Sequence, residues 1–253
     1  MSGVGTVNPR REQERQWASW ALSRWASFPA DQEPRPLVLV GPAASPEGGF
    51  RSGPAKLAFL YGRVEPAVPL PPGLLEVLGA GVTHQQRPGP PHDRGTLLIT
   101  SATKDHAVFA TDRGHRSLPA WRLTGPDLVG SLWVLDPAIA ATRWTPPEDG
   151  PPLPFQAAPH RAERATMGDD ERILRLAFTG GPPGLVEYPT VEVIDSDQAV
   201  VLLPVGHDTG PSGPRAAIGY SREVTATLNR PLGHRVLVDL DATPVMVQTP
   251  EGP

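Results

Sequence analysis

The sequence predicts an α+β protein that is predominantly antiparallel β, with two small β-rich lobes and an N-terminal amphipathic helix. The chain has 253 residues with 26 glycines and 33 prolines, which restricts it to short elements joined by many turns. Short apolar or alternating runs recur between turn residues, as is typical of strands. The expected order is a disordered start and helix over 1–30, an N-terminal α+β lobe over 31–145, a proline-rich linker over 146–165 and a C-terminal β lobe over 166–250.

The first predicted element is an amphipathic helix from Arg10 to Phe28, a stretch without glycine or proline. At about 100° per residue its apolar side chains gather on one side; they are Trp17, Trp20, Ala21, Trp25 and Phe28. We expect this helix to pack on the body of the protein. The alternatives are a partner-binding helix, because aromatic residues are enriched at interfaces, and a membrane-surface helix, against which Glu12 and Glu14 count. Trp17, Trp20 and Trp25 are therefore candidate binding residues.

The N-terminal lobe is expected to open with a strand and two short helices and to continue, after a polar loop over 82–95, with four strands. The first strand is Leu37–Val40, the helices are Ala55–Tyr61 and Leu74–Leu78, and the later strands are Thr96–Thr100, His106–Thr111, Arg116–Trp121 and Ser131–Asp136.

A hairpin is predicted where the turn Asp112–Gly114 joins two of these strands. Pro119 lacks a backbone N–H, so we expect the returning strand at a sheet edge. We expect the charge run at this turn to form a solvated tip, and the alternative is a binding site, because polar groups on a rigid hairpin can bind a partner. The candidate binding residues here are Asp112, Arg113, His115 and Trp121.

The linker is clearest over Pro146–Pro159, where six of 14 residues are proline and a semi-extended chain is expected. Six strands are predicted after it: Arg172–Phe178, Val191–Ile194, Ala199–Val205, Val224–Leu228, Arg235–Leu240 and Val245–Gln248. Turn residues over 231–233 and 241–244 separate the last three of them. We therefore expect the C-terminal end to be an antiparallel meander.

Charge and cysteine content exclude several classes of function. With 23 basic and 27 acidic residues the net charge is −4, so nucleic-acid binding lacks its electrostatic footprint. The absence of cysteine removes disulfides, thiolate catalysis and cysteine-ligated metals, and fits a reducing compartment. No apolar run reaches the roughly 18–20 residues that span a bilayer, and the first residues have no apolar core typical of a signal peptide. We therefore expect a cytoplasmic protein.

Sequence motifs of catalysis and cofactor binding are missing. There is no phosphate-binding loop, no dinucleotide fingerprint, no Gly-x-Ser-x-Gly elbow and no His-Glu-x-x-His pair. The seven histidines are scattered along the chain. The pairs Asp195/Asp197 and Asp239/Asp241 could hold Mg²⁺, but each follows a strand, where aspartate forms turns. We expect no catalytic residue, no metal site and no cofactor.

Two segments resemble stretches of uncharacterised actinobacterial proteins. One is FATDRGHRSLPAW, followed by the strand SLWVLDP, and the other is SREVTATLNRPLGHRVLVDLDATPVMV. In that group a threonine- and valine-rich strand precedes Pro-Leu-Gly and then Arg-Val-Leu-Val-Asp. The resemblance covers about a third of the chain. It implies an actinobacterial protein and carries no catalytic residue that could be transferred.

Together these observations predict a non-enzymatic binding or protein-interaction protein, with a protein partner contacted through helix 10–28 as one route. One alternative is an enzyme of unrecognised type, with an Asp/His/Arg site assembled between the lobes. The other is a membrane-surface protein anchored by helix 10–28. Tryptophans buried against the body would count against the anchor. A deep cleft that holds aspartates and histidines with shifted pKa values would favour the enzyme.

Overall fold

The computed structural model describes residues 9–80, 95–147, 161–210 and 218–249. The expected disordered start, most of the 82–95 loop and most of the proline-rich linker lie outside these residues. The chain divides into two units. The sandwich unit comprises Met1–Val40, Asp112–Gly114 and Trp144–Pro253, and the α+β unit comprises Gly41–Thr111 and His115–Arg143. The predicted α+β class, dominated by strands, is confirmed.

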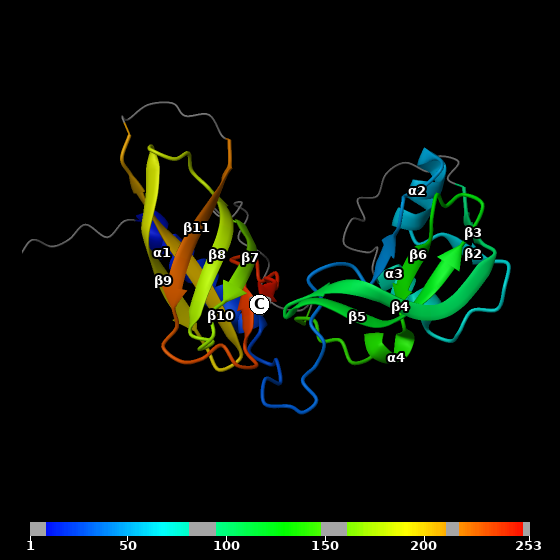
Figure 1. The fold of residues 1–253 in the computed structure, drawn as a ribbon, viewed down its shortest axis with the longest axis horizontal. Helices are drawn as coiled ribbons and strands as arrows, with labels where there is room; N and C mark the ends of the chain where they lie inside the picture. Colours follow the sequence, from blue (N-terminus) through cyan, green and yellow to red (C-terminus); the bar gives the residue numbers. More distant parts are fainter. Residues whose placement is uncertain (1–8, 81–94, 148–160, 211–217, 250–253) are drawn as a thin grey trace, which may run out of the picture. The chain divides into compact units, whose positions relative to one another are not determined.

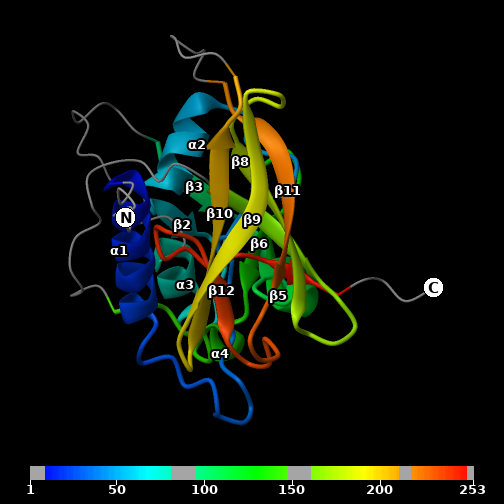
Figure 2. The same ribbon diagram turned by 90° about the vertical axis from the view of Figure 1, so that its left-hand side faces the viewer.

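The sandwich unit consists of two β-sheets and one helix in three layers (Figures 1 and 2). The first sheet has the order β12 (Val236–Val238), β10 (Ala199–Asp208) and β9 (Val186–Asp195). The second has the order β11 (Tyr220–Thr227), β8 (Ile173–Gly180), β7 (Arg161–Met167) and β13 (Val247–Gln248). In Figure 2, β9 and β10 lie between helix α1 (Pro9–Arg24) and β11.

Strand β10 is buried on both faces because its sheet forms the middle layer. Ala199, Val201 and Leu203 belong to the apolar cluster shared with α1, whereas Val200 and Leu202 belong to the cluster between the two sheets. A strand covered on both faces requires consecutive apolar residues instead of an alternating pattern. The run Ala-Val-Val-Leu-Leu meets this requirement.

Helix α1 packs its aromatic side on the first sheet. Trp25 is fully buried and donates its Nε1–H to the carbonyl of Ala242 at 2.9 Å. Trp17 is 8% exposed, and Trp20 packs partly buried against the same cluster. At the other end of the helix, Glu192 of β9 binds the guanidinium groups of Arg11 and Arg15 at 2.7 and 2.8 Å.

The helix ends at Arg24, before the predicted end at Phe28. Trp25 and Phe28 donate their backbone N–H groups to carbonyls three residues earlier, at 3.0 and 2.9 Å. These tighter turns take over from the α-helical pattern ahead of Pro29, whose ring disfavours a helical conformation in the residue before it. The apolar side of the helix therefore continues into a turn that still buries Phe28.

The expected antiparallel meander at the C-terminal end is wrong in its pairing. β12 runs parallel to β10, with Leu237 beside Val200, and β13 runs parallel to β7, with Val247 beside Ala165. The turn residues identified in the sequence lie between these strands, but each new strand joins a distant neighbour. Turn residues fix a local change of direction and leave the choice of a non-local partner open.

The described residues of the α+β unit form six strands and three helices. Its larger sheet has the order β1 (Ala44–Pro46), β6 (Leu132–Leu135), β5 (Gly114–Thr124) and β4 (Ser101–Thr111), and β2 (Val64–Pro66) pairs with β3 (Leu97–Ile99). The helices are α2 (Gly53–Leu60), α3 (Leu74–Ala80) and α4 (Pro137–Ala140). The two helices predicted from sequence are confirmed as α2 and α3. Ser52 caps α2 by accepting a hydrogen bond from the N–H of Ala55.

Two strand predictions in this half of the chain are wrong. β5 lies between β4 and β6 and is not an edge strand. Pro119 is tolerated because the ladder to β6 begins at Ala120, so the missing N–H falls just outside it. Leu37–Val40 forms no strand. The carbonyls of Leu37 and Val38 instead accept single hydrogen bonds from Trp144 and Asp112.

The division into units also differs from the predicted lobes. Residues 1–30 group with the C-terminal half because α1 is packed on β10 and β12. Residues 161–165, assigned to the linker, form the first part of β7. Their sequence, Arg-Ala-Glu-Arg-Ala, is too polar to show a strand pattern. No helix in the described ranges is long and apolar enough to cross a membrane.

We predict that Val238→Asp lowers the free energy of unfolding by several kcal/mol, roughly 3–5, because it places an unpaired charge in the apolar layer between α1 and β12. Chemical denaturation measures the change. Thr225→Asp is the matched control, because Thr225 is exposed on β11 opposite Arg175. Its effect should stay within about 0.5 kcal/mol. Equal stability of the Val238 variant and the unsubstituted protein would contradict the burial of β12.

Candidate functional site

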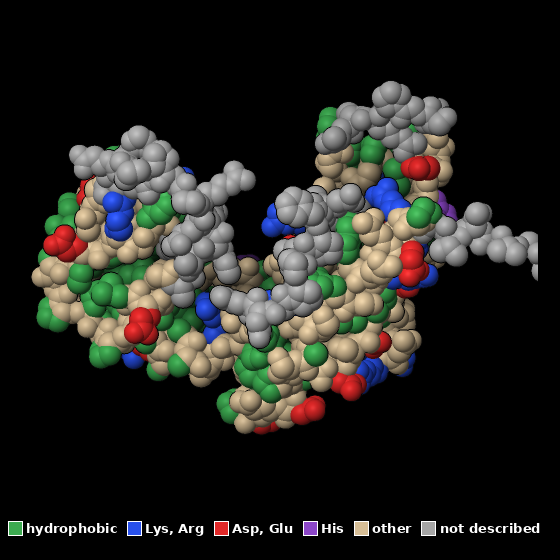
Figure 3. Space-filling view, turned by 180° about the vertical axis from the view of Figure 1, so that it is seen from behind, with side chains coloured by type: hydrophobic (Ala, Val, Ile, Leu, Met, Phe, Trp, Pro, Cys, Tyr) green, Lys and Arg blue, Asp and Glu red, His purple; other side chains and the backbone are tan. Residues whose placement is uncertain are grey.

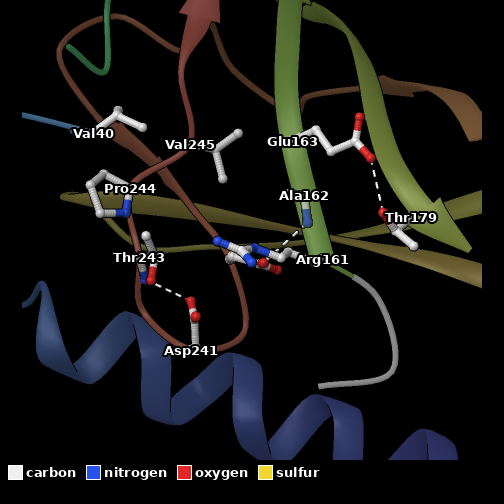
Figure 4. A pocket seen from close by; sticks show the side chains of 10 residues that line it. Val40, Arg161, Ala162, Glu163, Thr179, Asp241, Thr243, Pro244 and Val245 are labelled. Atoms are coloured by element: carbon white, nitrogen blue, oxygen red, sulfur yellow. Dashed lines mark hydrogen bonds between the residues drawn. The ribbon is translucent and has the colours of Figure 1, made fainter. Parts of the chain in front are cut away.

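A pocket of about 370 Å³ opens in the sandwich unit where the turn after β12 meets the start of β7 (Figure 4). It is lined by Val40, Arg161, Ala162, Glu163, Thr179, Asp239, Asp241, Thr243, Pro244 and Val245. Figure 4 shows Glu163 and Thr179 on one wall, Pro244 and Val245 on the other, and Arg161 between them. The pocket therefore combines three carboxyl groups, one guanidinium group and an apolar wall.

The turn that carries Asp239 is fixed by its own backbone. The backbone N–H of Asp239 donates to the carbonyl of Thr243, and its carbonyl accepts the N–H of Ala242, each at 2.9 Å. Ala242 has a φ of 62°, a left-handed conformation that is uncommon for a residue with a side chain. The Asp241 carboxylate accepts the N–H of Thr243 at 2.9 Å, so the turn-forming interpretation of this aspartate is confirmed.

Asp239 itself is held by two backbone donors. Its carboxyl oxygens accept the N–H of Leu240 at 2.8 Å and the N–H of Ala162 at 3.1 Å. The second bond joins the turn to β7 beside the point where the β7–β8 register shifts. A carboxyl group usually found in a solvated turn is therefore largely removed from water here.

Burial raises the pKa of Asp239 to about 6, and the neighbouring charge of Asp241 adds to the rise. The two N–H donors and the charge of Arg161 oppose this shift in pKa without cancelling it. The cost of ionisation shows that Asp239 has no counter-charge strong enough to offset its desolvation. A cation placed in the pocket would supply one.

The other acidic side chains of the pocket are more exposed. Glu163 accepts a hydrogen bond from the hydroxyl of Thr179 at 2.9 Å across the β7–β8 pair. The lining contains no histidine, serine or lysine, and the other side chains in it that could accept a proton are the carboxylates of Asp241 and Glu163. Within the part of the chain that the structure describes, no group of three or more His, Asp or Glu could hold a metal ion.

The tryptophans predicted as binding residues are used in packing. Trp17 and Trp25 lie in the core under α1, where Trp25 stacks against Trp144 with ring centroids 4.6 Å apart. Trp20 is partly buried beside them.

On the face shown in Figure 3, acidic and basic side chains are interspersed, and no continuous field of one sign covers it.

The residues predicted at the hairpin tip separate in the structure. Asp112 is 2% exposed and binds the Arg35 guanidinium with both carboxylate oxygens. Arg113 donates to the carbonyls of Gly233 and Arg235. His115 is exposed, and Trp121 donates its Nε1–H to Asp136 at 3.1 Å. The expectation of a solvated tip is therefore wrong for Asp112, and Asp112 and Arg113 serve to hold the sandwich unit together.

Arginine side chains bind every backbone carbonyl of the segment Leu228–Arg235. Arg172 donates to the carbonyls of residues 228 and 229, Arg235 to 230–232, Arg113 to 233 and 235, and Arg35 to 234. Burial lowers the pKa of Arg113 and of Arg235, while the charges of Asp112 and Asp195 act against it. Only Lys56 and Lys104 are lysines among the 23 basic residues, and the several donors of a guanidinium suit this task.

Sequence reasoning missed Arg161 and Glu163, because their strand was assigned to the linker. It identified Asp239 only as half of a turn-forming pair. The available signal was an Asp-x-Asp directly after the apolar run Val236–Val238, where the end of a buried strand can hold a carboxyl group away from water. The burial of that carboxyl depends on β7, whose partners are remote in sequence.

Comparisons with known proteins give no family. No protein-family description matches the chain, and no curated protein and no solved structure matches it. The actinobacterial resemblance and the expected location in the cell remain predictions.

We predict that Arg35→Ala destabilises the protein by roughly 3 kcal/mol, because it leaves the buried Asp112 carboxylate without its main partner. Arg35→Lys should recover only part of this loss, since an ammonium group cannot bind both carboxylate oxygens and the carbonyl of His234 in the same geometry. Denaturation of both variants and of Asp112→Asn, arranged as a double-mutant cycle, measures the coupling. Independent, additive effects of Arg35→Ala and Asp112→Asn would contradict the ion pair.

We also predict a pH-dependent effect of Asp239→Asn. Because the folded-state pKa is raised above the ordinary value of 3.8, the contribution of Asp239 to stability is greatest below about pH 4 and is lost as the pH rises through 6. Relative to the unsubstituted protein, the variant should gain up to about 3 kcal/mol between pH 4 and pH 7.5. Urea denaturation at several pH values tests this. Asp241→Asn should reduce the pH dependence without abolishing it, and a pH-independent difference for Asp239→Asn would refute the shift.

Proposed function

We propose that this chain is a non-enzymatic binding protein whose pocket takes a small aliphatic amine, a ligand with an ammonium group on an alkyl chain. The observation that carries the proposal is the Asp239 carboxyl, which lies in a pocket with Asp241 and Glu163 and only one cationic side chain, Arg161. Three carboxyl groups against one guanidinium favour a cation and repel an anion.

The energetics of Asp239 support the same ligand class. Its raised pKa means that the two N–H donors and Arg161 compensate the ionised carboxyl only in part in the free protein. An ammonium group at hydrogen-bond distance would stabilise the ionised form and would gain a charge-assisted hydrogen bond. The apolar wall formed by Val40, Pro244 and Val245 suits an alkyl chain.

Two observations favour this proposal over the alternatives raised by the sequence. The pocket holds a carboxyl group with a shifted pKa, which would suit an acid or a base, but no histidine, serine or lysine lines the pocket. The buried Trp17 and Trp25 leave little of the helix's aromatic side for a membrane or a partner. We therefore assign binding to the pocket and not to α1.

Calorimetric titration with 1,4-diaminobutane, with 1,4-butanediol and succinate as neutral and anionic controls, tests the proposal. We predict that the diamine binds at pH 7.5 and that neither control compound does. Binding should weaken by up to about tenfold for each pH unit below 6, because Asp239 takes up a proton while the diamine stays charged.

Asp239→Asn should abolish diamine binding and its pH dependence. Asp197→Asn is the matched control, because Asp197 pairs with Arg230 and is not part of the pocket lining. Binding of succinate, equal binding of the diol, or diamine binding unchanged in Asp239→Asn would each overturn the proposal.

A further inference from the structure

Within the described residues, one edge of strand β4 in the α+β unit has no neighbouring strand. β3 leads into β4 across Thr100, whose N–H donates to the carbonyl of Thr124 at 2.8 Å. β2 pairs with β3 on the other side. The last hydrogen bond of this pairing runs from the N–H of Ala67 to the carbonyl of Ile99, where β3 ends. Among the described strands, β4 has a neighbour on one side only, which is β5. A strand added to the free edge of β4 would therefore lie end to end with β2.

The accessible part of this edge is Ser101–Val108. None of its side chains is buried, and Val108 is 67% exposed, whereas Phe109 and Thr111 beyond it are buried. This stretch is long enough for an extended peptide of several residues. The N–H of His106 bonds to the carboxylate of Asp105 at 2.9 Å, which satisfies one backbone donor in the free protein.

The charged side chains of the β4–β5 hairpin favour some strands over others as partners for the free edge of β4. The exposed charged side chains of the hairpin's two strands are Lys104, Arg116 and Arg122 against Asp105, with His106 and His115 beside them, on a chain whose net charge is −4. Lys104 also pairs with Asp136 at 3.0 Å, and the two charged residues of the turn bind within the sandwich unit. A second copy of β4 is a poor fit. Two-fold antiparallel pairing centred on Lys104 would set Lys104 opposite its own copy, and pairing centred on Asp105 would do the same for Asp105; like charges directly opposite destabilise a cross-strand pair. Lysine on an edge strand is a usual protection against self-association.

We propose that β4 is a docking edge for an extended acidic segment of a partner protein, which adds a strand beside Ser101–Val108. Backbone hydrogen bonds supply affinity in this mode of recognition, and side-chain charges supply selectivity. Acidic side chains on the incoming strand would face the basic hairpin, and the same charges discourage pairing between copies of this chain. This surface is independent of the pocket around Asp239.

The test uses the full chain and two capped peptides of about eight residues, the first alternating glutamate with valine and the second lysine with valine. Hydrogen exchange should show added protection within Ser101–Val108 with the glutamate peptide and none with the lysine peptide. Arg116→Glu should weaken binding of the glutamate peptide roughly three- to tenfold and should permit binding of the lysine peptide. Arg51→Glu, on an exposed residue of the same unit outside the hairpin, is the matched control and should change neither.

Four results would overturn the proposal. They are no added protection with either peptide, equal protection with both, protection confined to other strands, or protection of β4 that appears with rising protein concentration alone. The last result would identify a second copy of this chain as the occupant. Reversed peptide preference in Arg116→Glu would also show that this variant is folded.

Discussion

The guanidinium groups that hold the segment Leu228–Arg235 are the constraint on which the sandwich unit depends. This segment has no helix or strand of its own, so its carbonyls need side-chain partners. Arg35, Arg113, Arg172 and Arg235 supply them. The fixed segment delivers β12 parallel to β10, and Asp239 follows β12 directly. The position of the candidate binding carboxyl is thus set by hydrogen bonds made ahead of it in the chain.

The sequence was sufficient for features that depend on neighbouring residues. Helices α2 and α3 of the α+β unit follow from local composition and from Pro54 at the start of α2, and β10 follows from its apolar run. The aromatic side of α1 could also be read directly. Its partner, the face of β10 and β12, could not, because apolar periodicity reports that a surface is buried and not what covers it.

Features set by distant residues escaped prediction for identifiable reasons. Arg161–Met167 has too few apolar residues to show as a strand, because much of β7 is exposed. A proline excludes a strand from the interior of a sheet only where its missing N–H would have bonded to a neighbouring strand. The pairing of β5 with β6 starts one residue after Pro119, so no hydrogen bond of that ladder is lost. Asp239 has the same local pattern as Asp195, whose carboxylate binds Arg235 instead of lining a pocket. Only the fold distinguishes the two.

The path of the chain through its two units has a consequence for the order in which they form during synthesis. The α+β unit lies between helix α1 and the strands of the sandwich unit in the sequence. Helix α1 is therefore synthesised before the α+β unit, whereas β10 and β12, which cover its aromatic side, are synthesised after it. Trp17 and Trp25 lack this cover until β10 and β12 have been made. Until then the nascent chain exposes aromatic surface of the kind that makes partly folded chains prone to aggregate.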